Sequence, residues 1–80
     1  MLEKKKFEAV LVLLVPQVVN LITENYPYDE ITASKEFYAS GVYSLLEQEN
    51  TKLWHLSALT LFHMFDEEKQ TGTFTFPEEA

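Results

Sequence analysis

Apolar residues recur along the first third of the chain with the spacing of one α-helical face. The i, i+3, i+4, i+7 pattern is followed by Phe7, Val10, Leu11, Leu14, Val18, Leu21 and Ile22. We expect these side chains to face the core from a helix over residues 3–24. Pro16 lacks an amide hydrogen and clashes with the carbonyl of the preceding turn. This helix should therefore be kinked around residues 13–16 or break into two pieces there.

The same helix carries a second set of apolar residues that point away from that face: Ala9, Val12, Leu13, Val15 and Val19. A helix that is apolar nearly all round is buried on more than one side. Because two short partner helices offer little cover, we expect a second chain to supply it. Val12, Val15 and Val19 are therefore candidate interface residues.

A second helix is predicted over residues 29–48, with Asp29 as a suitable N-cap. Gly41 lies in its middle, where glycine costs roughly 1 kcal/mol relative to alanine. Either Gly41 permits close contact with the first helix, or Ser40 caps a separate short helix over residues 42–47. We favour one helix with a local weak point.

A third helix is predicted over residues 51–69, with Asn50 or Thr51 as its cap. Its apolar residues form a wide stripe that includes an aromatic-rich centre. Ser57 offers an alternative cap, for a helix that begins at Ala58 after a lead-in turn.

The chain ends in a segment with a different pattern. Gly72 is a plausible helix stop, and residues 73–76 alternate polar and apolar side chains as extended chain does. Phe74 and Phe76 either dock on the core or pair with a second chain, so they join the interface candidates. The predicted fold is thus all-α, one domain over residues 1–80: a small three-helix bundle, kinked at its helical proline, with a short extended C-terminal tail.

Composition narrows the classes of function. The 80 residues include no cysteine, which excludes disulfides and thiolate metal sites, and the net charge is −7. Nucleic-acid binding needs Lys and Arg to neutralise phosphates, and the chain has no arginine, so we expect no nucleic-acid partner. Asp66, Glu67 and Glu68 have the wrong sign for a helix C-terminus. Acids in such a place can contact another part of the molecule, but we expect these to be solvated.

The N-terminus also raises the question of a targeting signal. Lys4–Lys6 precede the apolar run Ala9–Val15, as in a signal peptide, but no small-residue cleavage pattern follows. The longer segment Ala9–Ile22 is 14 residues long, short of the about 20 apolar residues that span a membrane. We therefore expect a cytoplasmic protein with no membrane partner.

No residue pattern assembles an active site. His63 and Glu67 are one helical turn apart, which favours a surface ion pair over a metal site, and neither H-E-x-x-H nor E-x-x-H occurs. The serines lack a G-x-S-x-G context, and the chain has no glycine-rich phosphate loop. We expect no catalytic residue, no metal and no cofactor, and hence no enzyme.

Aromatic side chains suggest a possible ligand pocket between the second and third helices. Its candidate residues are Tyr38, Tyr43, Trp54 and His55. Phe37 and Tyr38 are expected to pack in the core, and Tyr43 is the best candidate for an exposed aromatic residue.

The stretch from Phe37 to Glu47, continuing from Thr51 to Ser57, resembles families of short uncharacterised bacterial proteins, each a single helical domain of unknown function. This resemblance implies a small accessory or regulatory protein and transfers no site residue. The surplus apolar surface of the first helix and of the C-terminal segment also indicates a protein-interaction protein, which acts as a homodimer or binds another protein. The alternative is a small-ligand-binding module.

Overall fold

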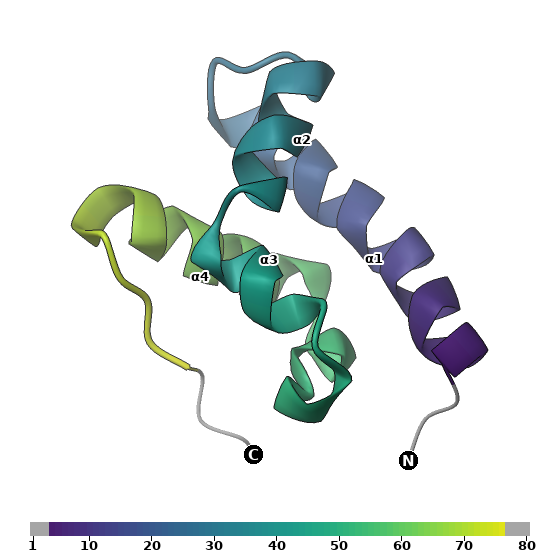
Figure 1. Cartoon of the computed structure of the whole chain (residues 1–80). Helices are drawn as coiled ribbons and strands as arrows, with labels where there is room; N and C mark the ends of the chain where they lie inside the picture. The colour runs from purple at the N-terminus through teal and green to yellow at the C-terminus, as the bar shows by residue number, and fades with distance from the viewer. Residues whose placement is uncertain (1–3, 77–80) are drawn as a thin grey trace.

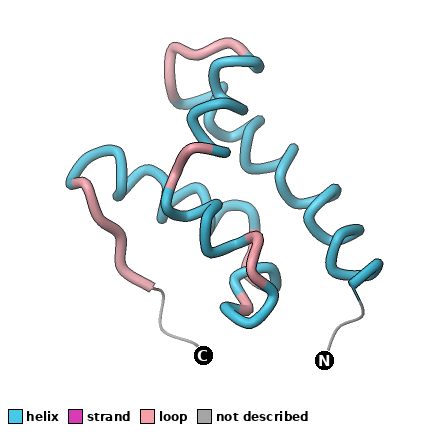
Figure 2. Tube along the Cα trace, viewed as in Figure 1, coloured by secondary structure: helices cyan, strands magenta, loops and turns pink. Residues whose placement is uncertain are grey.

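The computed structural model describes residues 4–76, and α-helices dominate this part of the chain (Figure 1). Its elements in order are α1 (Lys4–Asn25), α2 (Glu30–Tyr38), α3 (Gly41–Leu46), the 3-10 turns η1 (Glu49–Thr51) and η2 (Leu53–His55), and α4 (Ala58–Thr71). Figure 2 shows only helix and loop between residues 4 and 76. The predicted all-α class is confirmed, and residues 4–76 contain four α-helices in place of the three expected.

The first helix runs without a break through Pro16. The expected alternative of two separate pieces is therefore wrong, while a kink at Pro16 stays a prediction. Pro16 removes one backbone hydrogen bond, to the carbonyl of Val12. Val12 is 70% exposed, so water can hydrate that carbonyl, and the helix continues.

One face of α1 supplies a large part of the core. It packs against α4 and α2, and its N-terminal end meets η2. The side chains that it buries are Phe7, Leu14, Val15, Val18, Val19 and Ile22. The largest fully buried side chains of the other elements include Phe37, Leu46, Leu61 and Phe65. The core is therefore built from all four helices around the inner face of α1.

The predicted second helix is divided into α2 and α3, so the single-helix expectation is wrong. Ser40 adopts an extended backbone conformation, and its Oγ accepts a hydrogen bond from the Tyr43 backbone N–H at 3.1 Å. Serine is among the best N-caps because it satisfies an otherwise unpaired amide. The alternative with Ser40 as a cap is the one that the structure shows, and the separate helix begins at Gly41.

The predicted third helix begins later than expected. Residues 49–55 form two 3-10 turns, joined by Lys52 in the left-handed conformation at φ 60°. Ser57 then caps α4, since its Oγ accepts from the Thr60 backbone N–H at 3.1 Å. Gly72 ends α4 at φ 85°, which confirms the predicted glycine stop.

Candidate functional site

Four residues on the outer side of α1 form an exposed, mostly apolar strip. They are Ala9, Val12, Leu13 and Pro16, and we call them the outer strip. Val12 is 70% exposed and Leu13 68% exposed, the largest values among the large apolar side chains described. Isolated exposed apolar residues are normal, but neighbouring ones mark interaction surfaces. The outer strip is therefore the first candidate for a functional surface.

This placement corrects the interface candidates on α1. Val12 is exposed as expected, whereas Val15 is 7% and Val19 5% exposed within the chain's own core. Both side chains belong to the core cluster that α1 forms with the helices packed on it. Leu13 was missed as an interface residue. The periodicity alone did not separate these residues, because at 100° per residue Leu13 and Val19 lie equally far from the centre of the predicted core-facing stripe, on opposite sides of it.

A groove opens beside the outer strip, between α1 and the junction of α2 with α3. It has a volume of about 440 Å³, and its lining combines two aromatic side chains with one side of α1: Tyr38, Tyr43, Glu8, Leu11, Val12, Val15 and Pro16. We call it the tyrosine groove. The rings of Tyr38 and Tyr43 meet edge to face, with centroids 4.7 Å apart. Burial, the neighbouring Tyr38 and the charge of Glu47 raise the pKa of Tyr43, so its hydroxyl stays protonated at neutral pH.

The exposure of the two tyrosines is the reverse of the sequence expectation. Tyr38 is 52% exposed, while Tyr43 is partly buried and packs edge to face on Phe37. Phe37 itself is fully buried, as predicted. The reason is the break at Ser40, which ends α2 just after Tyr38 and turns α3 so that Tyr43 faces inward.

Trp54 and His55 lie in a different place from the tyrosine pair. Trp54 donates from Nε1 to the Glu49 carbonyl at 2.8 Å, and its ring meets Phe7 edge to face. His55 Nδ1 contacts the Lys52 carbonyl. Both residues thus stabilise the 3-10 segment near the N-terminal end of α1. The contacts described for residues 4–76 do not unite the four predicted pocket residues in one site.

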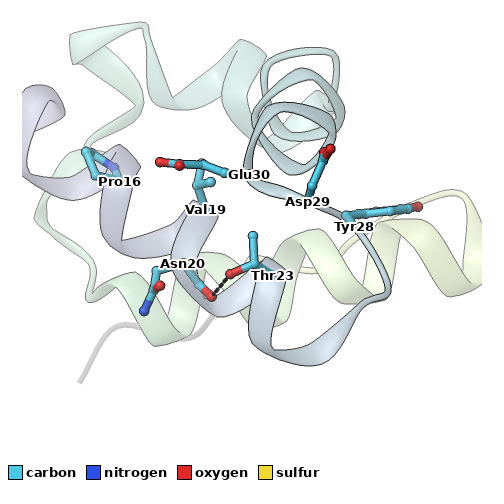
Figure 3. Close-up of a pocket in the computed structure, with 7 residues that line it drawn as sticks. All are labelled: Pro16, Val19, Asn20, Thr23, Tyr28, Asp29 and Glu30. Atoms are coloured by element: carbon cyan, nitrogen blue, oxygen red, sulfur yellow. Dashed lines mark hydrogen bonds between the residues drawn. The ribbon is translucent and has the colours of Figure 1, made fainter.

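A second pocket lies where α1 leads into α2 (Figure 3). Its volume is about 380 Å³, and polar side chains line much of it: Pro16, Val19, Asn20, Thr23, Tyr28, Asp29 and Glu30. Two of these polar residues, Thr23 and Asp29, hydrogen-bond to the backbone. Thr23 Oγ1 donates to the Asn20 carbonyl at 2.8 Å, and Asp29 accepts from the Thr32 N–H at 2.8 Å. That capping bond lowers the pKa of Asp29, so the carboxylate acts as the predicted N-cap.

The acidic end of α4, defined here as Asp66, Glu67 and Glu68, is bonded to three other parts of the chain. Asp66 accepts the hydroxyl of Tyr26. Glu67 accepts the N–H of Thr75 at 3.0 Å and its hydroxyl at 3.1 Å. The expectation that these acids are merely solvated is therefore wrong.

Glu68 makes the most specific of these contacts. Its carboxylate accepts the backbone N–H of Gly41 at 2.9 Å and of Val42 at 3.3 Å, in the first turn of α3. Gly41 therefore permits a close approach, but to α4 and not to the first helix as expected. A Cβ there would lie 2.9 Å from the Glu68 carboxylate and 3.3 Å from the ring of Phe74.

The two phenylalanines of the C-terminal segment have different surroundings. Phe74 packs against the core beside Gly41, and Phe76 stacks on it while remaining 56% exposed. With Thr75 held by Glu67, the chain after α4 folds back toward α3 (Figure 1). Phe74 is thus largely occupied within the chain, and Phe76 stays available as an interface residue.

Within residues 4–76, no group of three or more His, Asp or Glu side chains is arranged to hold a metal ion. α1 is the one described helix that is long and apolar enough to cross a membrane by length and composition, a property that core helices and signal sequences share.

No family model, no curated protein and no solved structure matches the chain. The candidate site therefore rests on the outer strip and the tyrosine groove themselves.

Proposed function

We propose that this chain is a small, non-catalytic protein-interaction protein that acts as a homodimer through the outer strip of α1. The carrying observation is that Val12 and Leu13 are 70% and 68% exposed side by side, next to the mainly apolar tyrosine groove. Burying such surface stabilises association by roughly 25 cal/mol for each Å² removed from water. Phe76 extends the apolar surface on another side of the molecule.

The cellular setting is part of the same proposal. The chain would work in the cytoplasm as an accessory or regulatory protein of the short bacterial type that its sequence resembles, without a nucleic-acid or membrane partner. The net charge of −7 and the absence of arginine support the lack of a nucleic-acid partner. A kink of α1 at Pro16 and an extended course of residues 73–76 belong to the proposal as well.

Sedimentation velocity over a concentration series tests the homodimer. We expect a monomer–dimer equilibrium in the micromolar range, shifted toward monomer in Val12→Asp. A chain that stays monomeric at submillimolar concentration would remove the proposal. Ile31→Asp is a suitable control, because Ile31 is 67% exposed on another helix and its replacement should leave the equilibrium unchanged.

The second candidate function is the binding of a small ligand in the tyrosine groove. Its volume of about 440 Å³ lies within the range of small-molecule sites. The groove is less favoured as a ligand site because its lining offers few polar groups to orient a ligand, namely Glu8 and the two tyrosine hydroxyls. A thermal-shift screen against metabolites, repeated with Tyr43→Ala, tests this: stabilisation lost in the variant would support a ligand.

A further inference from the structure

The exposed side of α1 carries opposite charges at its two ends. Lys5, Ala9 and Leu13 follow one another at i, i+4 spacing, and all are exposed. A parallel exposed row continues from Pro16 through Asn20 to Glu24. Residues four apart lie on the same side of a helix. The outer strip is therefore flanked by a basic residue at its N-terminal end and by an acidic residue at its C-terminal end.

This charge distribution is complementary to itself when the helix is reversed. If two copies of α1 lie antiparallel across a two-fold axis midway between Leu13 and Pro16, Lys5 of each copy lies level with Glu24 of the other. The two helix dipoles are also antiparallel in that arrangement, which is favourable. A parallel pair would instead place like charges together, which is unfavourable. Charge complementarity thus selects a second copy, in the antiparallel orientation, as the occupant of this face.

The tyrosine groove gives the most exposed leucine of that face a place to insert. Val12 and Pro16 belong to both the outer strip and the groove, so the groove opens directly beside the strip. In an antiparallel pair that crosses midway between Leu13 and Pro16, Leu13 of one copy lies level with Pro16 of the other, which lines the groove. The groove volume of about 440 Å³ is more than one leucine side chain occupies. A two-fold axis makes the insertion reciprocal.

We propose that two copies pair through antiparallel α1 helices, with each Leu13 inserted in the tyrosine groove of the other copy and each Lys5 beside the other copy's Glu24. This inference rests on the proposed homodimer and adds its geometry. In it, Tyr38 and Tyr43 act as the walls that hold the incoming leucine. The groove is thereby a protein-binding site that is complete only when the second copy contributes Leu13.

Cysteine cross-linking tests the orientation, and the chain suits it because it contains no cysteine. Lys5→Cys and Glu24→Cys are purified separately, mixed and exposed to a short bifunctional thiol cross-linker. We expect covalent dimers in the mixture and few in Lys5→Cys alone. Strong cross-linking of Lys5→Cys alone would indicate a parallel pair and overturn the inference. Lys5→Glu should weaken the dimer, and the double exchange Lys5→Glu with Glu24→Lys should restore it.

Leu13→Glu tests the insertion, with Leu59→Glu as its matched control. Leu59 is also exposed, at 55%, but lies on α4 away from the outer strip. Leu13→Glu changes both copies of the dimer, so it replaces two buried leucines at once. It should therefore weaken dimerisation at least roughly 100-fold. Leu59→Glu should leave the dissociation constant within about 3-fold, and Tyr43→Ala should weaken it by about 10-fold.

The possible outcomes separate this inference from the proposed function. A dimer that persists unchanged in Leu13→Glu and does not cross-link between Lys5→Cys and Glu24→Cys would overturn the antiparallel geometry while leaving a homodimer. A wild-type chain that is monomeric at submillimolar concentration would overturn both. Leu13-dependent cosedimentation of that monomer with phosphatidylglycerol vesicles would assign the outer strip to a membrane surface instead.

Discussion

At the acidic end of α4, three consecutive carboxylates each bond a different part of the chain, whereas on the outer strip of α1 the apolar side chains stay exposed. Asp66 binds Tyr26, Glu67 binds Thr75, and Glu68 binds the first turn of α3. Both regions are locally unfavourable: acids oppose a helix C-terminus, and leucine and valine cost free energy in water. The fold compensates one of them internally and leaves the other exposed.

The difference teaches how a locally unfavourable residue can be interpreted. Where the chain itself supplies a partner, the residue stabilises the tertiary structure, and its loss should lower the free energy of unfolding. Where the chain supplies none, the residue should matter for association and little for folding. The following changes separate these two effects. Stability is best measured at low concentration, because the proposed dimerisation would itself stabilise the folded chain.

The adjacent residues Leu13 and Leu14 provide the largest contrast. Leu14 is 9% exposed in the core, and Leu13 is 68% exposed on the outer strip. Leu14→Ala should lower the free energy of unfolding by about 2–4 kcal/mol, because it removes buried methyl groups and leaves a cavity. Leu13→Ala should change it by less than about 0.5 kcal/mol. Urea unfolding followed by circular dichroism measures both, and equal losses would break the comparison.

Replacement of Glu68 should have the next largest effect. Glu68→Ala leaves the N–H groups of Gly41 and Val42 without their carboxylate acceptor in a partly buried position. We expect a loss of about 2 kcal/mol, as for hydrogen bonds to a charged group. Glu47→Ala, an exposed acid at the other end of α3, should cost no more than about 0.5 kcal/mol. Similar losses in the two variants would show that the contact of Glu68 contributes little.

Gly41→Ala tests the close approach between α3 and α4. Its Cβ would lie 2.9 Å from the Glu68 carboxylate, so we expect a loss of about 1 kcal/mol in the wild-type background. In the Glu68→Ala background the loss should shrink to less than half, which a double-mutant cycle detects. Gly72→Ala is the control. Its cost comes from the positive φ of 85°, and nothing lies within 4 Å of the new Cβ. Glu68→Ala should therefore leave the cost of Gly72→Ala unchanged.

The smallest effect is expected at Tyr26. Burial and the hydrogen bond to anionic Asp66 raise the pKa of Tyr26 to about 12. Because this pKa lies above the ordinary value of about 10, the contribution to stability is complete below pH 10 and is lost as the pH rises through 12. Tyr26→Phe should cost about 0.5–1 kcal/mol near neutral pH. Ultraviolet titration should show a tyrosine that titrates near pH 12 and is absent from this variant; its persistence would contradict the assignment.

Parts of the candidate site could be found from the sequence. Val12 was predicted correctly as exposed because the apolar periodicity of α1 leaves it off the core-facing stripe. Val15 and Val19 were assigned to the interface wrongly, since the width of the buried face depends on how closely α2 covers α1. Tyr38 and Tyr43 were recognised as a possible pocket, but their exposure was reversed. A break at Ser40 changes the direction of every later side chain, and local propensity decides such a break only weakly.

The sequence alone determined the all-α class, the existence and extent of α1, the N-cap at Asp29 and the stop at Gly72. These features depend on residues within one or two turns of each other, so local sterics and hydrogen bonding are sufficient for them. Only the tertiary structure decided that Glu68 caps α3, that Tyr26 bonds Asp66, and that a groove opens between Tyr38, Tyr43 and α1. Each of these joins residues far apart in the chain, and their distance depends on how the helices pack.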